Sequence, residues 1–227
     1  MAELFSSPSL FAVVLTLAAY ELGCACQRRT GLAVCNPILL GAVGVAAVLG
    51  ALGIPGEIYQ QGCQAFSWLL TPATVCLAIP LHTQFARLRR DLPALLAGVA
   101  AGTLTSLLGI GVLCRMLALD AVLAASLLPK SITTAMGIVV SEAGGGDAAI
   151  TTAAIIATGI LGSVVGPALC RLFRLTCPAA QGAAFGTAAH VIGTSRAAEL
   201  GETAEAAGSL ALVVAGVLTA VLCPLLC

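Results

Sequence analysis

The chain has 227 residues, of which 59% are hydrophobic and only 9% are charged, and its formal net charge is zero. A soluble domain carries roughly a quarter charged residues, so this composition excludes a water-soluble globular protein and indicates an integral membrane protein. The balance of ten basic and ten acidic residues argues against a nucleic-acid partner. The apolar runs are long and lack alternation with polar residues, which favours helices over a transmembrane barrel.

Eight apolar segments follow one another along the chain, and most are long enough to span, since about 20 helical residues cross the hydrocarbon core. They lie at about residues 5–23, 33–53, 62–81, 92–114, 118–140, 148–170, 180–198 and 205–226. No long linker separates them, so residues 1–227 are predicted to form a single transmembrane domain. The predicted fold class is an all-α polytopic membrane protein with seven or eight apolar helical segments, some of them broken or re-entrant.

Three of these segments contain polar interruptions and are candidates for broken helices. The interruptions lie at residues 71–74 with Pro80, at 129–134, and at 190–199. The sequence also contains a weak internal repeat, in which Pro72 precedes Cys114-Arg115 much as Pro129 precedes Cys170-Arg171. Repeats with paired interrupted helices are typical of transporter binding sites, although a low-complexity composition can produce the same similarity.

Arginine clusters predict the orientation of the segments. They lie at Arg28/Arg29, Arg87/Arg89/Arg90 and Arg171/Arg174. The positive-inside rule places all three clusters in the cytoplasm, which requires an even number of spans between consecutive clusters. Three apolar segments separate the second cluster from the third, so one of them is predicted not to cross fully, and the segment around Pro129 is the best candidate. The alternative is that one arginine cluster lies outside.

Lys130 is the only lysine in the chain, and it lies inside the apolar stretch 117–140. A bare ammonium at that depth is costly, and ionisable residues within a membrane usually serve function. Pro129 precedes it, and three hydroxyl residues follow, namely Ser131, Thr133 and Thr134. Proline breaks the helical hydrogen-bond ladder, and hydroxyls can satisfy the freed backbone groups. The pattern predicts a broken helix that presents a cation and hydroxyls to something polar inside the bilayer.

A second polar cluster occupies residues 186–201. On a continuous helix Thr187, His190 and Thr194 would share one face, and an imidazole among hydroxyls could bind a carboxylate or relay a proton. The alternative for His190 is a buried histidine that bonds a neighbouring helix. Arg196 can meet Glu199 at a spacing of three residues, either within the site or as a structural ion pair near a helix end.

Lys130 and His190 on broken helices suit a small anion, because the N-termini of half-helices add partial positive charge. We therefore expect the two polar segments to pack against each other and to face a common cavity. No nucleophile–base pair, zinc motif or phosphate loop occurs in the sequence, so neither an enzyme nor a cofactor is expected. Cys24, Cys26 and Cys35 lack the histidine or further CxxC pair that a metal site would need.

Several of these stretches resemble signature sequences of the LrgB/CidB family. The matching stretches are residues 128–134 (LPKSITT), 186–197 (GTAAHVIGTSRA), 71–81 (TPATVCLAIPL) and Asn36-Pro37. The resemblance implies substrate contacts at Lys130, Ser131, Thr133, Thr134, His190, Thr194 and Arg196. We expect supporting roles for Asn36, Thr74 and Glu199. The chain departs from the family pattern at Thr71, His82, Ala135, Ala189 and Val191. Of these, Ala135 and Val191 flank the proposed site, so they bear on substrate identity more than on fold.

The resemblance implies two functions. The family includes bacterial proteins described as antiholin-like regulators of murein hydrolase export and autolysis, the homologous half of the plastid glycolate/glycerate translocator, and members linked to pyruvate uptake. The first function is a secondary transporter of small monocarboxylates, which the lysine and the histidine cluster favour; the second is an antiholin-like component of a holin system. The resemblance also implies a bacterial cytoplasmic membrane location, a small LrgA/CidA-like membrane partner and a homo-oligomer.

Overall fold

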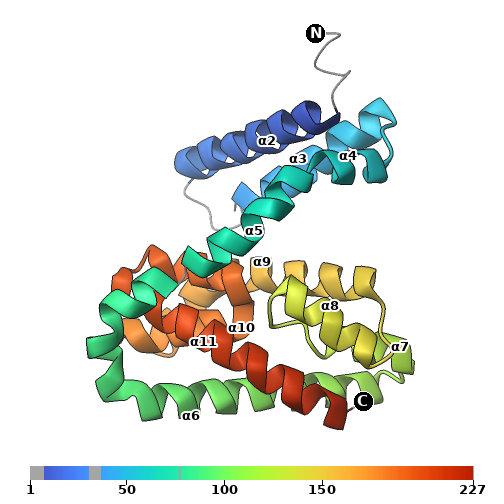
Figure 1. Ribbon diagram of the computed structural model, residues 1–227. Coiled ribbons are helices and arrows are strands. Elements are labelled where there is room, and N and C mark those ends of the chain that lie inside the picture. Colours follow the sequence, from blue (N-terminus) through green and yellow to red (C-terminus); the bar gives the residue numbers. More distant parts are fainter. Residues whose placement is uncertain (1–7, 31–36, 77, 227) are drawn as a thin grey trace. The chain divides into compact units, whose positions relative to one another are not determined.

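The computed structural model describes residues 8–30, 37–76 and 78–226 of the chain (Figure 1). These residues form helices and turns without a strand, which confirms the all-α prediction. Within them, four helices are long and apolar enough to cross a membrane, at Ser9–Thr30, Leu88–Met116, Ala148–Leu172 and Glu202–Leu225. The number of seven or eight apolar segments and the single transmembrane domain stay predictions. The chain divides into two compact units, Met1–Cys76 and Leu77–Cys227, which are described separately.

The first unit contains four described helices, α2 (Pro8–Thr30), α3 (Pro37–Leu52), α4 (Gly56–Gly62) and α5 (Gln64–Cys76). Helix α2 packs against both α3 and α4. The approach of α2 to α3 is close, because a Cβ added to Gly23 would lie 2.9 Å from the Cα of Pro37. A hydrogen bond of 2.7 Å between the hydroxyls of Thr16 and Tyr59 joins α2 to α4.

The predicted break at residues 71–74 is wrong, because α5 is helical through Pro72 and ends at Cys76. Proline is tolerated inside membrane helices where local adjustments satisfy the freed carbonyl. Helix α6 begins at Ala78, and Leu77 between them lies outside the described residues. So do Asn36 and the side chain of Thr74, two of the predicted supporting residues.

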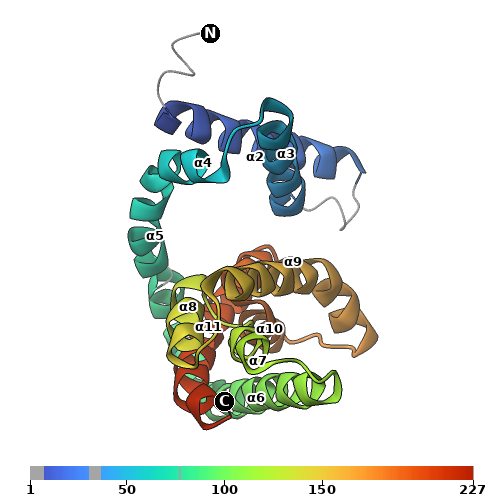
Figure 2. The ribbon, with the colours of Figure 1, turned by 90° about the vertical axis from the view of Figure 1, so that its right-hand side faces the viewer.

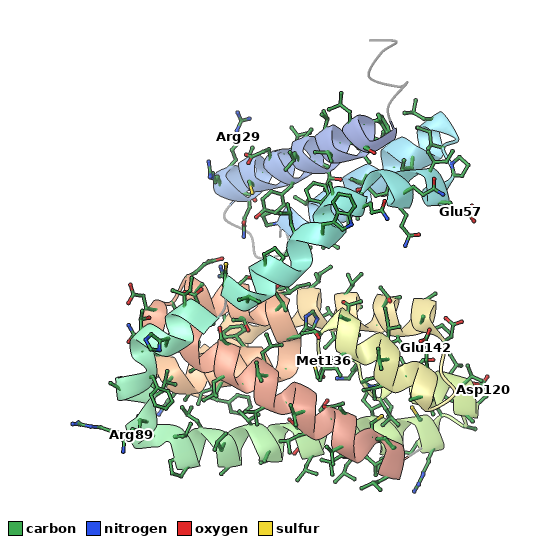
Figure 3. All side chains as sticks on the ribbon, in the orientation of Figure 1. Arg29, Glu57, Arg89, Asp120, Met136 and Glu142 are labelled. Atoms are coloured by element: carbon green, nitrogen blue, oxygen red, sulfur yellow. The ribbon has the colours of Figure 1, made fainter. Side chains whose placement is uncertain are left out.

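The second unit is built around α10. Its elements are α6 (Ala78–Met116), α7 (Ala121–Leu127), α8 (Thr134–Ala143), α9 (Ala148–Leu172), α10 (Pro178–Ala198), α11 (Glu202–Leu222) and a short 3₁₀ turn η1 (Cys223–Leu225). Helix α10 contacts α6, α9 and α11, and Figure 2 shows it between α9 and α6. Helix α8 packs on α9 and also reaches α11, toward which Met136 points (Figure 3).

Helices α6 and α9 run between the two ends of this unit. At one end, Asp91 of α6 and Cys177 before α10 line the same crevice, so the arginine clusters beside them, Arg89/Arg90 and Arg171/Arg174, share what we call the arginine-rich end. Figure 3 shows Arg89 at this end and Asp120 with Glu142 at the opposite end. The second and third arginine clusters therefore lie on the same side of the unit, as the positive-inside rule predicted.

The segment from α7 to α8 enters the unit and returns to the same end. Ala121 at its start and Gly144 after its last helix line one pocket, together with Arg115 and Leu226. This pocket lies at the end opposite the arginine-rich end. Between α7 and α8 the residues 128–133 are not helical. Since α6 and α9 both cross the unit, the segment between them does not. The predicted break around Pro129 is confirmed, and the re-entrant course of this segment in a membrane stays a prediction.

Helix α10 also reverses direction halfway along. Ala189 (φ −133°, ψ 22°) and His190 (φ 43°, ψ −135°) have non-helical backbone angles, and a positive φ at a non-glycine residue is strained. The second half folds back on the first, because a Cβ added to Gly193 would lie 2.9 Å from the carbonyl carbon of Phe185, eight residues earlier. Ala197 joins Phe185 and Cys170 in one buried cluster. The predicted non-helical backbone in 186–194 is confirmed, and the chain returns to the arginine-rich end.

Two interrupted segments thus enter the second unit from opposite ends. Their interruptions lie at 128–133 and 189–190. These are not the two positions that the weak sequence repeat pairs, which are Pro72 and Pro129. That repeat stays a prediction.

Small residues hold α10 against α11. A Cβ added to Gly182 would lie 2.9 Å from the Cα of Ala204, and one added to Gly186 would lie 2.9 Å from the Cα of Gly208. Both helices therefore present small residues four positions apart, the pattern that lets backbones approach closely in lipid. This contact fixes the first half of α10, which carries one wall of the crevice described below.

We predict that Gly186→Ala destabilises the protein by about 1–3 kcal/mol, because the new methyl group overpacks against backbone that cannot move aside. The thermal unfolding temperature of the purified protein in detergent measures the effect. The matched control is Gly109→Ala on α6, where an added Cβ meets nothing within 4 Å and where alanine has the better helix propensity. Equal unfolding temperatures for the two variants would contradict the close packing of α10 on α11.

Candidate functional site

A crevice of about 660 Å³ separates α6 from the first half of α10, a volume typical of small-molecule sites. Its α6 wall is one helical face with residues three or four positions apart, namely Asp91, Leu95, Gly98, Gly102 and Ser106. Its α10 wall consists mainly of alanines, with Thr187 near the inner end. The small side chains on both walls keep the space open. The crevice begins at the arginine-rich end and ends at Lys130 and Ser131.

Lys130 lies near the middle of the crossing helices. Its Nζ donates to Ser131 Oγ at 3.0 Å and to Ser106 Oγ at 3.3 Å. Ser106 is four residues, about 6 Å, from Gly102 at the centre of the span Leu88–Met116. Lys130 has no acidic partner among the described residues, where the ion pair found is Arg196 with Glu199. The inner end of the crevice therefore presents a half-buried cation whose charge no neighbouring carboxylate balances.

The two polar segments predicted from the sequence meet here, but through different residues than expected. Lys130 and Ser131 from the first segment line the crevice together with Thr187 and Ala188 from the second. Thr187 also contacts α6, since a Cβ added to Gly102 would lie 3.1 Å from the Thr187 methyl group. The expectation that the two segments share a cavity agrees with this arrangement.

His190 faces away from the crevice. Its Nε2 lies 2.9 Å from the backbone oxygen of Ile155 on α9, and the ring packs over Gly159. The predicted common face of Thr187, His190 and Thr194 is wrong, because the chain reverses at 189–190 and the helical periodicity does not continue across the reversal. The alternative, a buried histidine bonded to a neighbouring helix, describes the observed geometry.

The remaining predicted site residues serve the local structure around the crevice. Thr133 begins α8 by accepting a hydrogen bond from the N–H of Met136 at 3.4 Å, and Thr134 is the first residue of that helix. Thr194 donates to the carbonyl of His190 at 3.0 Å. None of the three lines the crevice.

Arg196 and Glu199 form an ion pair near the end of α10. The Glu199 side chain is 61% exposed and that of Arg196 is 30% exposed, and neither lines the crevice. Their geometry matches the structural ion pair considered for the sequence, so the structure does not bring them to Lys130.

Ser106 was missed by the sequence analysis. It lies within a long apolar helix and has no local motif. The signal that could have found it is the spacing of Gly98, Gly102 and Ser106, which places three small residues on one face of α6.

Comparison with known proteins identifies relatives along nearly the whole chain. The LrgB-like family matches residues 16–227. The "Antiholin-like protein LrgB" of Bacillus cereus (strain B4264) is 32% identical over 216 residues, which cover 95% of this chain and 94% of that protein. The protein of the same name from Bacillus anthracis (strain CDC 684 / NRRL 3495) shows the same identity and coverage. No solved structure is significantly similar.

The opposite directions of the two interrupted segments predict a labelling pattern. In a variant whose ten cysteines are replaced by alanine, Glu142→Cys should react with a membrane-impermeant thiol reagent from one face of the membrane only. Leu200→Cys, in the turn after α10, should react only from the other face. Both positions are exposed. Intact cells and inverted vesicles supply the two faces, and labelling of both cysteines from one face would contradict the fold of the second unit.

Proposed function

Because the chain belongs to the LrgB-like family, we propose that it is a membrane transporter that binds a small monocarboxylate at Lys130. The observation that carries this proposal is the Lys130 ammonium, which lies at the inner end of a crevice without an acidic partner among the described residues. An unbalanced cation inside a membrane is costly and marks a substrate or ion pathway. A carboxylate supplies the missing negative charge, and Ser106 and Ser131 hold the ammonium in place for it.

The arrangement of the backbone supports transport as well. Interrupted helices near the middle of the membrane, entering from opposite sides, are typical of secondary transporters, in which the substrate binds where the helices break. The crevice gives Lys130 access from the arginine-rich end, which the positive-inside rule assigns to the cytoplasm. Alternating access then requires this crevice to close and a path from the opposite end to open.

We further propose that the protein resides in the bacterial cytoplasmic membrane, since the relatives named above come from bacteria. The substrate class within this proposal is a short monocarboxylate such as glycolate, glycerate or pyruvate. A crevice that is walled mainly by small residues and ends on one cation fits a small anion with a single negative charge.

The second candidate function is that of an antiholin-like component of a holin system, acting on murein hydrolase activity and autolysis. The names of the relatives favour it. Such a role would depend on assembly in the membrane, as a homo-oligomer or with a small LrgA/CidA-like partner. It gives no reason for a cation at the inner end of a crevice, whereas transport does. The two functions are compatible if the flux of an acid controls autolysis.

We predict that Lys130→Met abolishes uptake of labelled glycolate, glycerate and pyruvate into proteoliposomes. Methionine keeps most of the apolar stem and removes the charge. Deleting one partner of a buried charge pair costs about 3 kcal/mol, which is roughly a hundredfold in affinity. Insertion into the membrane should not suffer, because a central lysine opposes insertion.

The matched control is Arg89→Met, which removes a cation from an exposed position at the arginine-rich end. Its uptake rate should stay close to that of the wild-type protein. Wild-type uptake by Lys130→Met at normal expression would refute the proposed site. Absence of any acid uptake by the wild-type protein, together with an effect of the protein on autolysis, would favour the antiholin-like function instead.

A further inference from the structure

A second, much smaller cavity adjoins the inner end of the crevice. Its volume is about 10 Å³, room for one water-sized group. It shares Ser106, Ser131 and Thr187 with the crevice, so a ligand bound at Lys130 has this cavity beside it. Two more hydroxyl residues line it, Thr103 on α6 and Thr219 on α11. A polar space of this size next to a carboxylate site suits one additional polar group of the same ligand.

Thr103 provides an independent indication of a ligand. The residue is only 4% exposed, and its Oγ1 has no hydrogen-bond partner among the described residues. Several other buried hydroxyls of this unit are bonded: Thr151 donates to Ser141, and Thr194 donates to the carbonyl of His190. Thr105, two positions along α6, donates to the carbonyl of Ala101 at 2.7 Å. Buried polar groups without a partner are rare and costly, so the free hydroxyl of Thr103 calls for a partner inside the cavity it lines.

The donors and acceptors around the cavity define that partner. The Thr187 hydroxyl donates to the carbonyl of Ala183 at 2.7 Å, so its oxygen can take part in a further hydrogen bond only as an acceptor. Thr103 is free to donate. A hydroxyl group of the ligand would accept from Thr103 and donate to Thr187, which satisfies all three groups.

We propose that Thr103 determines substrate specificity by binding the oxygen substituent on the carbon next to the substrate carboxylate. This inference rests on the proposed function, which places the carboxylate at Lys130. Because Ser106 and Ser131 contact Lys130 and also line the small cavity, a substituent on the adjacent carbon is the part of the ligand that reaches Thr103. The cavity thereby selects 2-hydroxy acids over unsubstituted acids of the same chain length.

The test compares 2-hydroxypropanoate with propanoate, measured as uptake of each labelled acid into proteoliposomes. The wild-type protein should prefer 2-hydroxypropanoate by roughly tenfold, the effect of one well-placed hydrogen bond. Thr103→Val keeps the shape of the side chain and removes its hydroxyl, so the preference should fall to near unity while uptake of propanoate persists. Thr103→Ser should retain the preference. The matched control Thr105→Val removes an exposed hydroxyl from the same helix and should leave the ratio unchanged.

If Thr103 served only the structure, Thr103→Val would lower the thermal stability. We expect the opposite: because valine removes an unpartnered buried hydroxyl, the thermal stability of Thr103→Val should equal or exceed that of the wild-type protein. If Thr103→Val is poorly folded, Thr103→Ala, which also lacks the hydroxyl, supplies the ratio. An unchanged ratio in the folded variant, or a wild-type protein that takes up both acids equally in a Lys130-dependent manner, would overturn the role of Thr103 alone. Uptake that does not depend on Lys130 would overturn the proposed function itself.

Discussion

The second unit depends on one constraint, which is that backbone groups released from a helix inside a membrane must find partners within the protein. The break between α7 and α8 meets it locally, since the N–H of Lys130 donates to the carbonyl of Leu127 and that of Ile132 to the carbonyl of Pro129. Ile132 and Pro129 are buried there. The reversal in α10 meets it with a side chain, because Thr194 donates to the carbonyl of His190. The His190 ring finds its own partner in the backbone oxygen of Ile155 on α9. Each break is tolerated because other helices surround it.

Close packing of small residues makes that enclosure feasible. Gly182 and Gly186 bring α10 against the backbone of α11, while Gly159 and Gly162 of α9 leave room for His190 and Ala189 at the reversal. Apolar attraction is weak between helices in lipid, so association depends on close contact of this kind. Glycine and alanine also line the crevice between α6 and α10, where their small side chains leave space between the two helices. Glycine and alanine therefore serve both the contact on one side of α10 and the opening on the other.

Sequence reasoning predicted the features that have a local chemical cause. Proline followed by hydroxyl residues identified the break at Pro129, and the count of segments between arginine clusters indicated that this segment does not cross fully. It failed where the answer depends on distant packing. No residue pattern at 186–194 indicates that the chain reverses at Ala189, so the prediction assumed a continuous helix with His190 and Thr187 on one face. The reversal instead turns the imidazole toward α9. Ser106 and Thr103 belong to an apolar helix without a motif, and their place beside Lys130 follows from packing in three dimensions.

The position of Lys130 also connects the two candidate functions. The cation at the break between α7 and α8 is bonded to Ser106 on α6 and to Ser131 beside it, so its position is tied to the packing of this segment against α6. Binding of an anion adds an interaction at that junction and shifts the equilibrium toward whichever conformation holds the anion better. Under the proposed function, the protein responds to the concentration of its ligand through its conformation as well as through flux. An effect on autolysis then needs no pore, because a ligand-dependent change of conformation or of acid flux is sufficient to influence other components of the membrane.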